Sequence, residues 1–222
     1  MKTKLKVKMA IDAGMTLLLL LLMAYERVGE TAHEWLGMGI CALFILHHIL
    51  NRGWSRNLLK GRYSVLRVAQ TILNAGVALV TLGSMVSGLL LSEHTFPFLP
   101  IRSLYSYASR VHMLCAYWGF VLMSLHLGFH WSMMVGIAKR YLRSNRVCTW
   151  ILRGAAFGIA TYGIYAFVKR NIGNYMLLQY HFVFFDFEEP LILFVPDYAA
   201  VMGLFIFIGH YCAEGFKKME KR

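Results

Sequence analysis

Long apolar runs, separated by short polar and basic segments, dominate the pattern of this chain. A helix needs about 20 mainly apolar residues to cross a bilayer, and six runs meet or approach that length. We place these spans at residues 7–25, 33–51, 67–91, 110–137, 150–168 and 197–213. The pattern predicts an all-α integral membrane protein with six transmembrane helices.

The composition agrees with this prediction. The chain of 222 residues is 58% hydrophobic and 15% charged, whereas soluble domains are roughly 45–50% apolar and about 25% charged. The four cysteines stand singly, with no CxxC or CxxCH spacing. This spacing excludes covalent c-type haem attachment and argues against a disulfide framework.

The net charge of +12 is informative through its placement. In a soluble protein such a surplus would suggest a nucleic-acid partner, but here the basic residues cluster between apolar runs, at 2–8, 52–67, 139–153 and 217–222. With a cytoplasmic N-terminus, 18 of the 23 Lys and Arg fall on the cytoplasmic side, as the positive-inside rule requires. We therefore expect a multi-pass protein of the cytoplasmic membrane, with both termini cytoplasmic and no nucleic-acid partner.

Four histidines form a pattern within the spans. His33 and His47 lie on the second span and His112 and His126 on the fourth, each pair fourteen residues apart. Fourteen residues advance a helix by about 21 Å and nearly four turns, so both members of a pair share a face. Because the two spans run in the same direction, the pairs match in depth. Matched imidazoles at two depths suit bis-histidine ligation of two b-type haems, with one axial ligand from each helix.

Neighbouring residues leave the inner ligands open. His48 adjoins His47, and His130 lies one turn beyond His126, so each is an alternative ligand. Three arginines near the span ends are candidate partners for haem propionates through charge-assisted bonds: Arg27, Arg52 and Arg110. Four glycines offer room either for a porphyrin or for close helix packing: Gly37, Gly76, Gly83 and Gly88.

Two stretches carry a resemblance to a known family. HEWLGMGICALFILHHILNRGW begins at His33, and HMLCAYWGFVLMSLHLGFHW begins at His112. Together they resemble the cytochrome b-like flavinylation-associated cytochromes, over about the first 140 residues. The resemblance implies a membrane electron-transfer subunit that works with flavin-carrying proteins outside the cytoplasmic membrane. It also implies haem ligands at His33, His47, His112 and His126.

The chain divides into two parts on this basis. Residues 1–142 form a four-helix dihaem b-type unit, and residues 143–222 add two spans joined by an aromatic and acidic extracytoplasmic loop at 169–197. One interpretation of the loop is an interfacial segment, because aromatic residues gather at membrane surfaces. The other is a quinol or partner site, because quinol oxidation needs a proton acceptor. The candidate residues for that site are His181, Asp186, Glu188 and Glu189.

These observations predict a membrane-bound dihaem b-type cytochrome rather than a stand-alone enzyme. It would carry electrons between a quinol or cytoplasmic donor and an extracytoplasmic flavin-carrying redox protein, with two haem b and the quinone pool as a further partner. One alternative is a di-iron membrane metalloenzyme that uses the histidines of the cytoplasmic side. Another is a proton-coupled transporter, which would need buried carboxylates beyond Asp12.

Overall fold

The computed structural model describes residues 3–99, 102–141, 145–180, 182–184 and 189–220, which form helices and connecting turns without any strand. This confirms the all-α prediction. The elements are α1 (Thr3–Leu22), α2 (Tyr25–Val28), α3 (Glu30–Leu50), α4 (Arg52–Arg56), α5 (Val65–Leu91), the 3-10 turn η1 (Arg102–Leu104), α6 (Tyr105–Phe129), α7 (Trp131–Tyr141), α8 (Arg146–Lys169), α9 (Ile172–Met176) and α10 (Leu191–Met219).

Five of the described helices are long and apolar enough to cross a membrane: α3, α5, α6, α8 and α10. The membrane character of the chain is therefore confirmed. Helix α1 has the length of a span but carries Lys4, Lys6, Lys8 and Asp12, which lowers its hydropathy. The sixth span stays a prediction.

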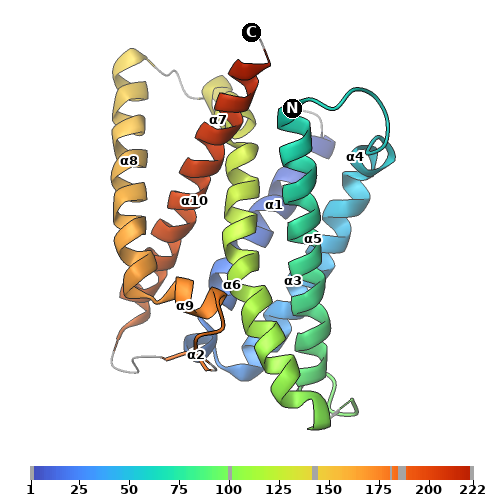
Figure 1. Cartoon of the computed structure of the whole chain (residues 1–222). Coiled ribbons are helices and arrows are strands. Elements are labelled where there is room, and N and C mark those ends of the chain that lie inside the picture. The colour runs from blue at the N-terminus through green and yellow to red at the C-terminus, as the bar shows by residue number, and fades with distance from the viewer. Residues whose placement is uncertain (1–2, 100–101, 142–144, 181, 185–188, 221–222) are drawn as a thin grey trace.

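The long helices alternate in direction along the bundle (Figure 1). The start of α1 and the end of α10 lie at one end of the molecule together with α4 and α7, whereas α2 and α9 lie at the other. Helices α3 and α6 consequently run the same way, as the sequence predicted. We call the end with α2 and α9 the outer end and the end with α4 and α7 the inner end.

Helix α6 occupies the centre of the packing. It lies against α5 on one side and α10 on another, while α10 also packs on α8, and α1 packs on α3. Glycines permit the closest approach: a Cβ atom on Gly128 would lie 2.5 Å from the Ile206 carbonyl oxygen, and one on Gly209 would lie 2.6 Å from that of Leu125. Small residues commonly allow such contacts between membrane helices. The buried core, which includes Phe120, therefore centres on α6 and α10.

Two predicted boundaries were wrong. The fourth span, expected as one helix over 110–137, is broken at His130, where α6 ends and α7 begins. The last helix begins at Leu191 rather than at 197 and contains Pro196. The earlier start places Asp197 inside the helix, where it is fully buried and bonded to Lys169 and Arg170.

Candidate histidine site between α3 and α6

The outer histidine pair consists of His33 on α3 and His112 on α6, whose rings lie close together. His33 stands in the first turn of α3 and His112 in the second turn of α6, with 6.1 Å between ring centroids and 73° between ring planes. Metal–imidazole bonds of about 2 Å, added to a ring radius of about 1.2 Å on each side, place the centroids of two axial histidines about 6 Å apart. The observed spacing therefore fits an iron held between the two rings.

Helix α5 orients His112. The Nδ1 atom lies 3.1 Å from the Ser84 carbonyl oxygen and 3.2 Å from the Ser87 hydroxyl. A Cβ on Gly88 would come within 3.2 Å of the ring, so this glycine makes room for the imidazole. Metal-binding histidines usually donate the second ring N–H to an acceptor of this kind. A donor at Nδ1 leaves Nε2 as the ligand atom.

His33 is held differently. Its Nδ1 atom is buried and has no hydrogen-bond partner among the residues described, although the Leu22 backbone carbonyl lies near the ring. The Tyr25 ring meets it edge-on, with 5.0 Å between centroids. His33 is thus positioned mainly by ring contacts.

At the inner end, both histidines again have Nδ1 engaged. His47 Nδ1 lies 2.7 Å from Asp12 Oδ1 on α1, and His126 Nδ1 lies 2.8 Å from Asn74 Oδ1 on α5. His126 interacts electrostatically with His47 from across the helix pair. The amide of Asn51 approaches His47 Nε2 at 3.4 Å, a long contact that ligation would have to displace.

The alternative inner ligands have other environments. His48 is exposed, and its Nδ1 lies 3.0 Å from the Phe44 carbonyl oxygen of its own helix. His130 stands at the break after α6, with its ring centroid 4.8 Å from that of His126. Among the four candidate inner ligands, His47 and His126 are the two with a described Nδ1 hydrogen bond to a side chain of a neighbouring helix, which favours them as the inner pair.

Sequence reasoning missed the groups that hold these rings. The sequence connected Asp12 only with the transporter alternative, and it assigned no role to Asn74 or Ser84. A usable signal exists, since a polar residue inside an apolar span must find an internal partner. The sequence could not say which histidine each polar residue would meet, because that depends on how the helices pack.

The glycines and arginines that the sequence associated with the haems have different surroundings in the structure. A Cβ on Gly76, Gly83 or Gly88 would meet an α6 side chain, so these three serve close helix packing. Gly37, one turn after His33, has nothing within 4 Å and remains compatible with a bound porphyrin. Of the predicted propionate partners, Arg27 on α2 and Arg110 on α6 lie toward the outer end, and Arg52 on α4 lies at the inner end.

Arg170, Glu189 and Asp197 of the C-terminal third form an ion-pair network. Arg170 makes a forked pair with Glu189, at 2.5 and 2.7 Å, and also donates to Asp197 at 2.8 Å. Asp197 further accepts hydrogen bonds from Tyr162 and Lys169. The Arg170 hydrogen bonds hold the pKa of Glu189 below its usual value, so this carboxylate stays ionised and engaged. The other residues of the predicted quinol site, His181, Asp186 and Glu188, lie outside the described residues.

Two further features have structural explanations. Glu34 lies close to Glu30 and His94, but its oxygens already accept from the Ser92 hydroxyl and from backbone N–H groups of residues 93–95. It therefore fixes the turn after α5.

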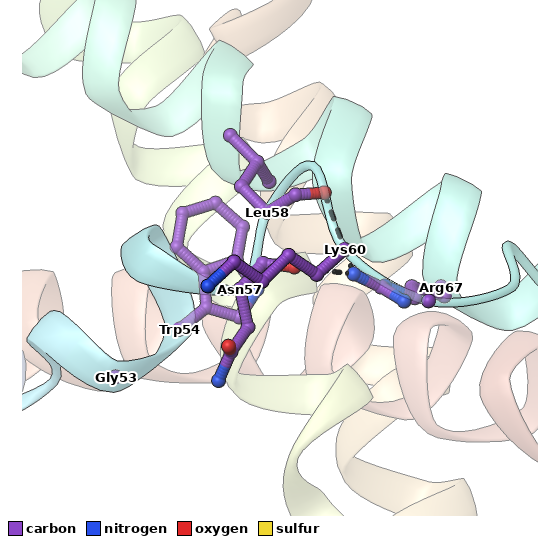
Figure 2. Close-up of a pocket in the computed structure, with 7 residues that line it drawn as sticks. Gly53, Trp54, Asn57, Leu58, Lys60 and Arg67 are labelled. Carbon is purple, nitrogen blue, oxygen red and sulfur yellow. Dashed lines mark hydrogen bonds between the residues drawn. The ribbon is translucent and has the colours of Figure 1, made fainter.

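A surface pocket of about 480 Å³ lies at the inner end, lined by Trp54, Lys60 and Arg67 among others (Figure 2). Arg67 donates to the Asn57 and Leu58 carbonyl oxygens. That guanidinium thus shapes the α4–α5 loop.

No protein family, curated protein or solved structure matches this chain. The functional interpretation consequently rests on the geometry of the histidines and on the chemistry of their neighbours.

Proposed function

We propose that this protein is a membrane-bound dihaem b-type cytochrome. The supporting observation is the arrangement of four histidines on α3 and α6, in which His47, His112 and His126 have Nδ1 bonded to a neighbouring helix. This directs Nε2 to the ligand position, where ligation by His47 displaces the Asn51 amide. His33 and His112 would hold the outer haem, and His47 and His126 the inner one. Bound haem iron supplies reversible one-electron chemistry, and the chain fixes the two imidazole pairs about 21 Å apart along the helices.

The charges on α1 favour counting it as a sixth span. Asp12 bonds to His47, and Lys8 Nζ donates to Asn51 Oδ1 at 2.6 Å. These two polar groups therefore meet partners on α3 rather than lipid. Six spans with both ends of the chain at the basic face give cytoplasmic termini in the cytoplasmic membrane.

The partners follow from the resemblance of the first 140 residues. An extracytoplasmic flavin-carrying redox protein would meet the outer end, and the quinone pool or a cytoplasmic donor would exchange electrons with the protein. A di-iron centre would draw on the same inner histidines, but His48 is exposed and its Nδ1 lies against the Phe44 carbonyl oxygen of its own helix. The dihaem assignment uses the two outer histidines as well, which a di-iron site at the inner end leaves unexplained.

The decisive measurement is the haem content of the full-length protein purified in detergent. We expect oxidised and dithionite-reduced spectra of a b-type cytochrome, and two haem b per chain in a pyridine haemochrome assay. A preparation without haem b contradicts the proposal. Two non-haem irons per chain by elemental analysis would instead favour the metalloenzyme.

A further inference from the structure

We infer that Asp12 makes the inner site the more reducing of the two by placing a carboxylate on His47. This inference rests on the proposed function and gives it a direction. Electrons at the inner site would lie higher in energy than electrons at the outer site, so that transfer runs from the inner end to the outer end.

The position of Asp12 brings its carboxylate to one imidazole. It lies on α1, in a helix that is otherwise mostly apolar beyond Lys8, and its Oδ1 atom is 2.7 Å from His47 Nδ1. His47 is its ion-pair partner in the described part of the chain, where no Lys or Arg lies within ion-pair distance of Asp12. The negative charge is therefore directed to this imidazole.

The hydrogen-bond acceptors at Nδ1 differ among the four histidines. His126 bonds to the neutral amide oxygen of Asn74, and His112 to the neutral carbonyl of Ser84. Among the described contacts, His47 is the one histidine of the four whose Nδ1 meets a carboxylate. Each inner imidazole is held at Nδ1 by a polar side chain of an adjacent helix, and His47 Nε2 also has the long contact with the Asn51 amide.

The charge of the acceptor at Nδ1 affects how an imidazole would act as a metal ligand. A carboxylate at Nδ1 raises the basicity of the imidazole as a metal ligand. Its charge also favours the oxidised, more positive state of bound iron, and hydrogen bonding and charge near the axial ligand are established levers on haem potential. Two cations oppose this effect: Lys8 lies one turn before Asp12, and Lys217 acts on His130. Both lie nearer the end of the bundle, so the carboxylate in direct contact with His47 dominates.

A lower reduction potential at the inner site would favour electron transfer toward the outer end. Haem held by His47 and His126 would be the electron donor, and haem held by His33 and His112 would be the acceptor. A reductant at the inner end and a flavin-carrying oxidant at the outer end would match this order.

The test is an optical redox titration of the full-length protein, after the haemochrome assay has established two haems per chain. Asp12→Asn keeps the hydrogen-bond geometry and removes the charge. We expect one of the two redox components to shift to higher potential, with a change in its low-spin EPR signal, while the other component stays in place. A His33→Ala background, which removes the outer haem, identifies the shifted component as the inner one.

Asn74→Asp provides the opposite change on the facing ligand and is independent of the folding of the Asp12 variant. It should shift the same component to lower potential. Thr161→Ala on α8, whose hydroxyl donates to the Phe157 carbonyl oxygen of its own helix, is the neutral control and should leave both components unmoved. The inference is overturned if Asp12→Asn loads two haems with unchanged potentials, or if Asn74→Asp leaves the inner potential unchanged. Absence of haem in the wild-type protein would instead refute the proposed function.

Discussion

Polar groups within the helices are used in two different ways in the two parts of this molecule. Around α3 and α6, the hydrogen bonds described for the His112 and His126 rings involve Nδ1, so that Nε2 remains to bind something else. Around α8 and α10, the polar atoms of Asp197, Arg170 and Glu189 bond to one another until their capacity is used. A polar group that keeps a spare ligand atom indicates a binding site, whereas a saturated network indicates a structural clasp.

The largest effect should come from removing a histidine of the first kind. His112→Ala should lose one of the two haems, because its partner His33 cannot hold an iron alone, and the haemochrome signal should fall by half. His94→Ala is the control, since this exposed residue only joins the turn fixed by Glu34. Loss of haem in the control, or full loading of the His112 variant, would break the distinction between the two regions.

Removing a member of the saturated network should affect stability instead of haem. Arg170→Ala leaves Asp197 buried without its arginine and leaves Glu189 with the longer Lys169 contact at 3.7 Å. Breaking a buried ion pair by deleting one partner costs about 3–5 kcal/mol, which we expect as a lowered free energy of unfolding in detergent. The haem content per folded chain should be unchanged. A variant as stable as the wild type would show that the network is not a clasp.

The glycine contacts between α6 and α10 should produce a smaller effect. Gly128→Ala adds a methyl group 2.5 Å from the Ile206 carbonyl oxygen, and such overpacking typically costs about 1–3 kcal/mol. Gly158→Ala on α8 is matched, because nothing lies within 4 Å of its Cβ position. Thermal unfolding should separate the two, and equal melting temperatures would contradict the close approach of the backbones.

The smallest effect concerns pH. The pKa of Glu189 is lowered in the folded protein by hydrogen bonds from Arg170. Its contribution to stability is therefore fully present above the unfolded pKa of about 4.3 and is lost as pH falls through the lower folded value. The difference in melting temperature between wild type and Glu189→Gln should be largest near neutral pH and shrink on acidification. A difference that grows toward low pH would reverse the assignment.

The sequence was sufficient for features that depend on one helix at a time. The fourteen-residue spacing placed His33 opposite His112, because a regular helix converts spacing into depth and face. The sequence was insufficient for features that depend on contacts between two helices. The break at His130, the partner of Asp12 and the burial of Asp197 all follow from contacts between segments far apart in the chain. Local hydropathy carries no record of those contacts.

The position of α6 in the packing sets the dynamics of the molecule. Helix α6 has eight buried residues and is held by α5 and α10, whereas α3 has no buried residue among its twenty-one. Local opening follows the density of buried contacts, so backbone amides should exchange with solvent deuterium slowly along α6 and rapidly along α3. Each histidine pair thus joins a helix with many buried residues to one with none, and the latter carries His47 and its bond to Asp12.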